Sequence, residues 1–342
     1  MTRASVPHRA SGTSIKTIDE IDPAQWDDLI SADPSSSPFH TREWLACLAS
    51  AYPHWKVGAI VHSERGKITA ALPFVRRRRS GVLLLESLPF GGYGGLIQAD
   101  PRFDGEDLVA QFLSQAAGPL SVVRLVDGSG RSLDRWKGAV TSRTSTVLDI
   151  SSGYEVASAQ YRANVRKNLK HARDAQLVIE PVESQSSLEA FRKLAIYAYR
   201  LHMSTLPYPP ALYESIARLL VPVGRATFEL AYKDGMAVAG SLHLVGAHEM
   251  LNWLTPAYRE FQELRANTLL IDHAIRSGVV AGLRRYDLGS SQGSEGLDRF
   301  KRAWGGYQRE YEAIERASAP AALAGRLMAF VRRRGTSKVL RS

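Results

Sequence analysis

The feature of this chain that most constrains its fold is a repeated pattern of one helix followed by one β-hairpin. The pattern is predicted first over residues 42–52, 56–62 and 68–75, and again over residues 211–220, 226–232 and 237–245. Trp44 and Tyr213 stand at the same distance before the turn glycines of the two copies, Gly66 and Gly235. The same order of elements at the same spacing predicts a duplicated unit.

The length of the chain agrees with two domains, because 342 residues exceed what one hydrophobic core usually holds. A Ser-Ser-Gly stretch at residues 151–153 interrupts the pattern between the copies. A helix over residues 321–331 would be amphipathic and would allow contact with a membrane surface, and a solvated extension is the alternative. We therefore expect a disordered basic segment, a first domain, a second domain and a basic tail over residues 1–13, 14–150, 151–316 and 317–342.

The composition is that of a globular protein, with 44% hydrophobic and 23% charged residues. A single cysteine, Cys47, allows neither a disulfide framework nor a thiolate metal site within the chain, and no H-x-x-x-H or C-x-x-C pair indicates another metal site. The net charge of +10 favours anionic partners in general. No apolar run reaches the length of a signal peptide or a membrane span, so we expect a cytoplasmic protein, with peripheral contact at the inner membrane surface through the tail.

The second half contains the pattern of an anion site. A strand over residues 249–254, a helix over 268–280 and a strand over 285–288 follow the second hairpin, and this order makes the two strands parallel. The first turn of the helix then directs unpaired N–H groups into the space beside the strands, where a phosphate group is favourable. We expect an anionic cofactor at this place, in contact with Arg265, Asn267, Thr268, Ser290 and Ser291.

Residues 286–305 carry the clearest sign of chemistry. A strand-like start leads into a Gly/Ser-rich turn and then into a short helix-like piece, which presents Lys301 beside Phe300 and Trp304. Backbone N–H groups of such a turn can point at an anion, and a lysine shielded by aromatic rings interacts more strongly with developing negative charge. We expect this segment to hold an acyl carbonyl, and a tight turn with a surface lysine is the alternative.

Taken together, these residues resemble a known superfamily. The order helix, hairpin, strand, helix, strand is similar to the N-acetyltransferase (GNAT) fold, and two such units in tandem resemble the Fem-type peptidoglycan aminoacyltransferases and the acetyltransferase-like proteins of cellulose and exopolysaccharide clusters. The resemblance implies an α/β fold of the α+β kind, with two tandem GNAT-like domains that each hold a mixed sheet flanked by helices. It covers residues 14–316, and the segments that carry it are 39–44, 161–172, 239–243, 286–289 and 300–305.

The resemblance also implies an activity. Members of the superfamily move an acyl group, acetyl or aminoacyl, from an activated carrier to an amine or hydroxyl, here of a cell-envelope or exopolysaccharide-related acceptor. The lysine of their phenylalanine–lysine pair lies near the reacting carbonyl, and the matching residue is Lys301.

The donor expected from the resemblance is acyl-CoA, used as a co-substrate with no tightly bound cofactor. Fem-type ligases that use aminoacyl-tRNA usually carry a long helical arm, and no such stretch is visible between residues 182 and 281. The glycine-rich pyrophosphate loop of acetyl-CoA enzymes is missing as well, since residues 259–268 contain no glycine. An aminoacyl-tRNA-dependent peptide ligase therefore stays an alternative.

Other roles at the site are open on sequence alone. The base that takes the proton of the acceptor is expected among Asp287, His243 and His202, and His243 fits a hydrogen-bonded core histidine equally well. A basic helix face near the middle of the chain either grips an anionic acceptor or forms solvated surface. The residues expected to bind substrate are Arg162, Arg166, Lys167, Tyr258, Phe300 and Trp304.

The first half is expected to be a degenerate copy that lacks an equivalent of Lys301. A binding or scaffolding protein for an anionic partner is the alternative from a different functional class. The four arginines at residues 76–79 suit nucleic acid or an acidic lipid surface. They stand at the end of a predicted hairpin, where a solvated strand end explains them as well.

Overall fold

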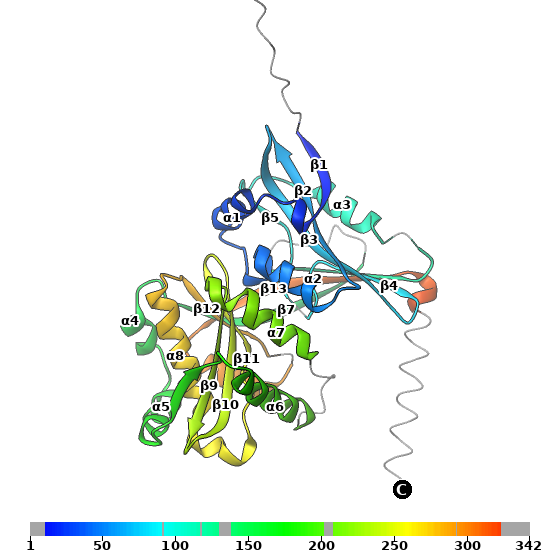
Figure 1. The fold of residues 1–342 in the computed structure, drawn as a ribbon. Helices are drawn as coiled ribbons and strands as arrows, with labels where there is room; N and C mark the ends of the chain where they lie inside the picture. The colour runs from blue at the N-terminus through cyan, green and yellow to red at the C-terminus, as the bar shows by residue number, and fades with distance from the viewer. Residues whose placement is uncertain are drawn as a thin grey trace, which may run out of the picture.

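The computed structural model describes residues 11–90, 92–116, 118–129, 138–201, 208–291 and 293–322. Within these ranges thirteen strands join in one mixed sheet, with helices packed on its faces (Figure 1). The expectation of mixed sheet flanked by helices is confirmed. His202 and all but two residues of the helix expected over 321–331 lie outside the described residues. The role of His202 as a base and the amphipathic helix therefore stay predictions.

The strands follow the order β1-β2-β3-β4-β6-β13-β7-β12-β11-β10-β9-β8, and β5 pairs with β3 beside this path. Their bounds are β1 (Gly12–Thr17), β2 (Lys56–Glu64), β3 (Lys67–Arg79), β4 (Val82–Glu86), β5 (Ile97–Gln98), β6 (Ser121–Asp127), β7 (Ala139–Asp149), β8 (Val178–Pro181), β9 (Ala226–Lys233), β10 (Met236–Val245), β11 (Glu249–Leu254), β12 (Arg285–Ser290) and β13 (Tyr307–Ala317).

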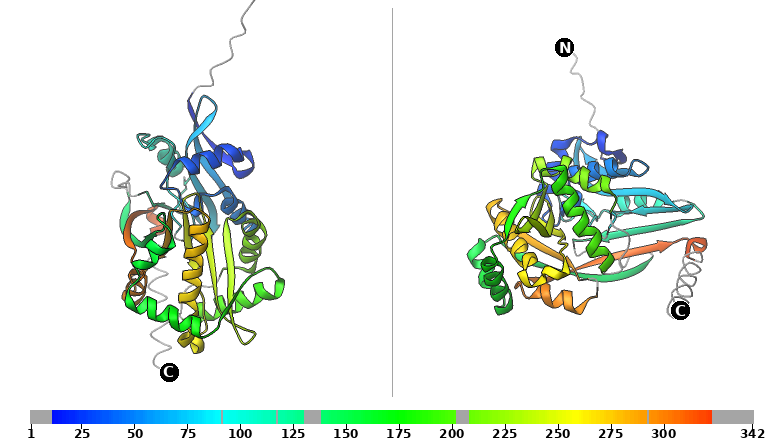
Figure 2. Two further views of the ribbon diagram at one scale, coloured as in Figure 1. Left: turned by 90° about the vertical axis from the view of Figure 1, so that its left-hand side faces the viewer. Right: turned by 60° about the horizontal axis from the view of Figure 1, so that its bottom comes forward.

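The α-helices pack on the two faces of this sheet. Their bounds are α1 (Pro23–Ala32), α2 (Arg42–Ala51), α3 (Glu106–Ser114), α4 (Tyr154–Ala159), α5 (Ala163–Asp174), α6 (Gln185–Leu201), α7 (Pro210–Leu219), α8 (Ala266–Val280) and α9 (Glu295–Arg302). In the second half, α8 and α5 cover one face of the strands, while α6 and α7 cover the other (Figure 2). None of the described helices is long and apolar enough to cross a membrane.

The predicted repeat occurs twice, as α2-β2-β3 and as α7-β9-β10. Both hairpins turn through two residues with positive φ, Arg65 and Gly66 in one copy and Asp234 and Gly235 in the other. Two residues of positive φ give the backbone twist that suits a two-residue hairpin. The predicted bounds agree with the observed ones to within two residues, except that β3 continues through the arginine run to Arg79.

Each half also holds one parallel pair of strands. β4 pairs with β6 in the first half and β11 with β12 in the second, and the connecting segments contain α3 and α8 respectively. The predicted parallel pair of the second half is thus confirmed. Its helix begins at Ala266, before the predicted start at Thr268, and β12 continues to Ser290.

The two halves exchange their last strands. β7, which ends the first half, pairs with β12 of the second half, whereas β13, near the end of the chain, pairs with β6 of the first half. β7 and β13 also pair with each other. A boundary after residue 150 therefore separates the two sequence repeats without dividing the sheet, and each half contains a strand that the other half supplies.

The hydrophobic core also crosses from one half to the other. The buried residues of α2 and α7 belong to one cluster, in which Trp44 meets Trp253 edge-on with ring centroids 5.3 Å apart. Arg218 of α7 donates a hydrogen bond to the Ser50 hydroxyl of α2 (2.8 Å). The equivalent helices of the two copies thus pack on each other, which fixes the space between the halves.

Candidate active site

The parallel strands β11 and β12 separate partway along their length. They pair at Glu249–Leu251 and Arg285–Asp287, and beyond these residues β11 continues to Leu254 and β12 to Ser290 without pairing with each other. A cavity of about 1000 Å³ lies at this opening, and the unpaired ends of both strands line it. The unpaired ends of β11 and β12 thus form part of the wall of a candidate site.

One wall of the cavity is aromatic and is built by both halves. The first half supplies Phe39 and Phe90, and the second supplies Tyr199, Tyr208 and Trp253. The rings of Tyr208 and Trp253 are stacked with centroids 4.8 Å apart, and Phe90 meets Tyr208 edge-on at 4.8 Å. Phe90 has φ +66, a strained conformation for a residue with a side chain, which the surrounding rings hold in place.

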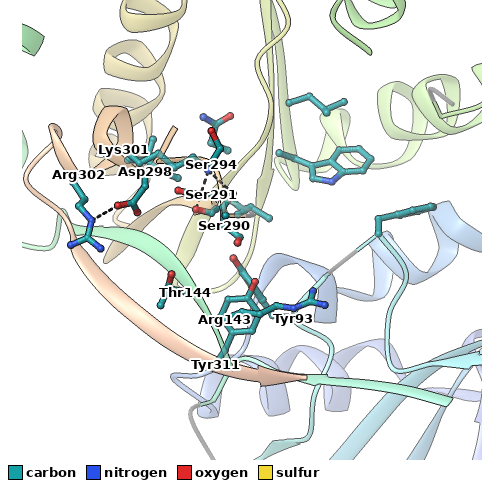
Figure 3. Close-up of a pocket in the computed structure, with 18 of the residues that line it drawn as sticks. Tyr93, Arg143, Thr144, Ser290, Ser291, Ser294, Asp298, Lys301, Arg302 and Tyr311 are labelled. Carbon is teal, nitrogen blue, oxygen red and sulfur yellow. Dashed lines mark hydrogen bonds and ion pairs between the residues drawn. The ribbon is translucent and has the colours of Figure 1, made fainter. Parts of the chain in front are cut away.

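The rest of the lining is mostly polar. Arg143 and Thr144 of β7 and Tyr311 of β13 face the residues of α9 across the cavity (Figure 3). Burial raises the pKa of the Tyr311 hydroxyl, while hydrogen bonding to Ser290 and the charge of Arg143 oppose this shift. The exchanged strands therefore form one side of the site, and α9 with the turn before it forms the other.

Lys301 is the buried cation of this lining. Its side chain is on α9, whose first turn is capped by the Ser294 hydroxyl, and the residue is 7% exposed. The ammonium donates hydrogen bonds to the carbonyl oxygens of Gly289 (3.0 Å) and Ser290 (2.9 Å). An ammonium has three N–H donors, so one is left for a group in the cavity. Burial lowers the pKa of Lys301 to about 8, although Asp287 and Asp298 favour its charged form.

The turn that accepts these two hydrogen bonds depends on Gly289. This residue has φ +74, which glycine adopts without strain, and its N–H donates to the Asp287 carboxylate (2.7 Å). A carboxylate that fixes an N–H two residues on is a common way to stabilise a turn. The turn therefore offers carbonyl oxygens to Lys301, where the sequence led us to expect N–H groups aimed at an anion.

Asp287 lies beneath the turn and does not line the cavity. It is fully buried and paired with the Arg309 guanidinium of β13, which in turn pairs with Glu249 of β11 (2.8 Å). Burial raises the pKa of Asp287, and Arg309 opposes that shift. Because one carboxylate oxygen accepts from Gly289 and the other from Arg309, the structure assigns Asp287 to holding the turn, and the role of general base does not fit its position.

His243 is also absent from the lining of the cavity. It is fully buried on β10, with one ring nitrogen 2.8 Å from the Tyr286 hydroxyl and the other 3.3 Å from that of Thr227. Burial lowers its pKa to about 4. The structure therefore agrees with the core histidine that the sequence left open, and it does not bring His243 to the proposed chemistry.

The residues expected to bind substrate lie outside the lining of the cavity. Trp304 is buried against Tyr161, and Phe300 packs beside it, so both rings belong to the core behind α9. Tyr258 packs edge-on against Tyr197. Arg162, Arg166 and Lys167 are exposed around the start of α5. Their predicted role in binding the acceptor stays a prediction.

The residues expected to bind the cofactor fall into two groups. Ser290 and Ser291 line the cavity, whereas Arg265, Asn267 and Thr268 do not. Arg265 precedes α8 with φ +55, and the Asn267 amide donates to the Thr255 carbonyl oxygen (3.2 Å). In the part of the chain that the structure describes, no group of histidine, cysteine, aspartate and glutamate residues could hold a metal ion.

Sequence reasoning missed the contribution of the first half and of the exchanged strands. Arg143 and Tyr311 stand in polar strands with no motif around them, and the aromatic wall comes from five separate segments. One available signal was overlooked. The sequence Leu133-Asp-Arg-Trp-Lys137 repeats Leu297-Asp-Arg-Phe-Lys301, so the first half does carry a counterpart of Lys301 in its sequence. That counterpart lies outside the described residues.

Comparison with known families gives one domain match. Residues 159–302 match the model of the acetyltransferase (GNAT) domain. This segment contains the repeat unit of the second half, the separated strands and Lys301. No curated protein sequence matches the chain.

Several solved structures resemble nearly the whole chain. A crystal structure of FemX has a TM-score of 0.65 and 13% identity, covering 87% of this chain and 96% of its own. A tandem GNAT protein from the clavulanic acid biosynthesis pathway has a TM-score of 0.54 and 14% identity, with coverages of 91% and 99%. L-PGS from Bacillus licheniformis has a TM-score of 0.54 and 14% identity, with coverages of 92% and 97%. At these identities the likeness shows the fold, and the expected tandem GNAT architecture is confirmed.

Proposed function

We propose that this chain moves an acyl group from acyl-CoA to an amine or hydroxyl that enters the cavity between its halves, a proposal that the match of residues 159–302 to the acetyltransferase (GNAT) domain model supports. The observation that carries the proposal is the position of Lys301. Its ammonium is buried, oriented by two carbonyl oxygens, and placed on the lining of the cavity where β11 and β12 separate. A fixed donor in a site of low dielectric constant is suited to stabilising charge that develops during a reaction.

In the proposed step, the acceptor nitrogen or oxygen attacks the thioester carbonyl carbon. A new bond to that carbon forms, and the carbonyl electrons move onto its oxygen. The third N–H of Lys301 donates to this oxyanion, an interaction worth roughly 3–4 kcal/mol in known enzymes. The carbon–sulfur bond then breaks, the carbonyl re-forms, and CoA leaves as the thiolate. Lys301 stays protonated throughout, so the step requires its ammonium form.

The acceptor must also lose a proton. Glu295 and Asp298 are the carboxylates of the described lining. Asp298 already accepts a hydrogen bond from the Arg302 guanidinium (2.6 Å). We therefore assign the proton to Glu295, which lines the cavity from the first turn of α9. This assignment replaces Asp287 and His243, neither of which lines the cavity.

The lengths of the described helices favour acyl-CoA as the donor over aminoacyl-tRNA. The longest described helix, α6, has 17 residues, so the described second half contains no long helical arm of the kind expected for tRNA binding. Arg265, Asn267 and Thr268 at the start of α8 are the proposed contacts for the phosphates of CoA, because the first turn of a helix favours an anion. Ser290 and Ser291 are the proposed contacts near the thioester.

The acceptor we propose is a sugar- or peptide-linked amine or hydroxyl of the cell envelope or of an exopolysaccharide. A cavity of about 1000 Å³ is far larger than an acetyl group needs, and it joins an aromatic wall to a polar one. Such a lining suits an acceptor with both an apolar face and hydrogen-bonding groups.

The test is turnover of a panel of acyl-CoA thioesters, followed by release of free thiol, with sugar and peptide amines as acceptors. We expect turnover with at least one thioester, and stabilisation of the fold by about 2.7 kcal/mol when that thioester is present at about 100 times its Kd. Aminoacyl-tRNA, nucleic acid and anionic vesicles form the parallel arms. If no thioester is turned over or stabilises the fold, and a ligand of another arm binds instead, the result would contradict this proposal. Binding of aminoacyl-tRNA would then favour the peptide ligase, and binding of nucleic acid or vesicles would favour the scaffold.

A further inference from the structure

Four charged side chains meet in the interior below the Gly289 turn. Arg309 of β13 pairs with Asp287 of β12 and with Glu249 of β11, and Glu249 also accepts from Arg285 (3.1 Å). Asp287 and Glu249 are fully buried, and the Arg309 side chain is 16% exposed. Arg309 therefore joins the two strands that separate at the cavity to the strand that crosses into the first half.

This cluster is connected to Lys301 through one turn of backbone. Asp287 accepts from the Gly289 N–H, and the Gly289 carbonyl oxygen accepts from the Lys301 ammonium. The charge of Asp287 also favours the protonated form of Lys301. Arg309 pairs with Asp287, whereas Lys301 donates to the Gly289 and Ser290 carbonyl oxygens. The hydrogen-bonded path from Arg309 to the lysine therefore runs through Asp287 and the turn.

We propose that Arg309 is a positioning residue for Lys301: it keeps Asp287 ionised and oriented, so that the Gly289 turn holds the lysine ammonium toward the cavity. The inference rests on the proposed function for its kinetic readout and on the geometry alone for its direct one. A buried carboxylate without a cation takes up a proton, and a protonated Asp287 neither attracts Lys301 nor holds the Gly289 N–H as strongly.

The charged and titratable surroundings of these groups are few among the described residues. Asp287 and Asp298 act on Lys301. Arg309, Glu249 and Lys301 act on Asp287, and the charge of Asp287 in turn acts on the hydroxyls of Tyr93, Tyr286 and Tyr311. The Tyr93 ring of the first half lies under the Arg309 guanidinium, 5.0 Å from its centroid, with its pKa well above the ordinary value because of burial. With Arg309 removed, Asp287 keeps the nearby like charge of Glu249 and loses its main cationic partner, so its protonation is favoured.

The sign of the effect on Lys301 follows from these partners. The pKa of Lys301, about 8, is set by burial, which lowers it, and by Asp287 and Asp298, which raise it. Protonating Asp287 removes the larger of the two opposing charges. We therefore expect the pKa of Lys301 to fall, so that the upper pH limit of an activity that needs the ammonium moves to lower pH.

The experiment compares Arg309→Met and Arg309→Lys with Arg285→Met as the matched control. Arg285 shares Glu249 with Arg309 but makes no contact with Asp287, and its other partner is the Pro34 carbonyl oxygen. The titration of Lys301 is measured in the free proteins by competitive labelling of amines over a pH series, with peptide mass spectrometry. The basic limb of kcat/KM for the thioester is measured in parallel.

We expect Arg309→Met to lower the pKa of Lys301 and to shift the basic limb to lower pH, with a fall in kcat of about tenfold or more and little change in KM. Arg309→Lys, which can pair with Asp287 alone, should restore part of both readouts, and Arg285→Met should leave the Lys301 titration in place. Unchanged titration in Arg309→Met, or the same shift in Arg285→Met, would overturn the inference. A wild-type protein with no acyl transfer would instead contradict the proposed function, and the labelling result would still decide the role of Arg309.

Discussion

Each half of the molecule contains one parallel pair of strands at the equivalent position, but the pair stays together in the first half and separates in the second. In the first half, β4 and β6 pair over Leu83–Glu86 and Ser121–Arg124. Ser87, the residue after β4, is also hydrogen-bonded to β6. Its N–H donates to the Arg124 carbonyl oxygen (2.8 Å), and its hydroxyl accepts from the Val126 N–H (2.9 Å). In the second half, β11 and β12 stop pairing after Leu251 and Asp287 and leave a cavity.

Under the proposed function, this difference is what separates a reactive half from a supporting one. A thioester can reach the backbone between two strands only where they no longer bond to each other. The first half, with its strands closed by Ser87, instead contributes wall residues such as Phe39, Phe90 and Tyr93. A lysine alone does not make the distinction, since both halves carry the sequence Leu-Asp-Arg, an aromatic residue, then Lys.

The largest effect expected from the comparison concerns the buried carboxylates. Glu249 of the second half is 0% exposed and its partners Arg285 and Arg309 are 19% and 16% exposed. Glu86 of the first half is 7% exposed, and its partners Arg77 and Arg124 are 19% and 46% exposed. Removing Glu249 leaves Arg285 without this carboxylate partner and leaves Arg309 with Asp287 alone. Glu249→Ala should lower the free energy of unfolding by about 3–5 kcal/mol, and Glu86→Ala should lower it less.

Urea unfolding of the two variants checks this prediction, because the midpoint and slope together give the free energy of unfolding. An equal loss for Glu86→Ala and Glu249→Ala would break the comparison. An equal loss would mean that buried ion pairs stabilise both pairs of parallel strands to the same extent. The second half would then depend no more on its charged cluster than the first half does.

A smaller effect concerns stability in acid. His243 of the second half has its pKa lowered to about 4 by burial, so between pH 6.5 and 4 the unfolded chain binds a proton that the folded protein does not. Stability should fall as the pH is lowered through this window, by about 3 kcal/mol from this residue. Burial also lowers the pKa of His40 in the first half, but the Gly95 carbonyl oxygen and nearby carboxylates oppose the shift.

The measurement is the free energy of unfolding of His243→Gln and His40→Gln between pH 7 and 4. We expect the slope of stability against pH to flatten in His243→Gln and to change less in His40→Gln. A steeper dependence on His40 would show that the first half, and not the half with the cavity, carries the main cost of a neutral buried histidine.

Much of the fold could be predicted because it is encoded locally. The repeat unit and β11 follow from apolar periodicity and turn residues, and β11 has the predicted bounds of 249–254. The exchange of β7 and β13 could not be predicted, because the pairing of Ala139–Val147 with Tyr307–Glu315 joins segments far apart in the chain that read as ordinary strands. Pattern identifies a strand, whereas its neighbour depends on the packing of the whole sheet.

The site shows the same limit. The glycine-rich turn and the lysine–aromatic pair predict Lys301 because they stand close in sequence, and the structure places Lys301 on the lining of the cavity. Residue chemistry alone predicts Asp287 and His243, but what decides their roles is burial and the partners Arg309 and Tyr286, which come from distant strands. Residue type indicates which chemistry is available, and only the packing shows which groups reach the cavity.

The most direct test of the account is a matched pair of variants, Lys301→Met and Lys137→Met, assayed for kcat/KM with a turned-over acyl-CoA. The account predicts a loss of about 10²–10³ for Lys301→Met, a basic limb near pH 8 in the wild type that reflects the pKa of Lys301, and no change for Lys137→Met. Equal losses in the two variants, or full activity in Lys301→Met with its fold intact, would contradict it.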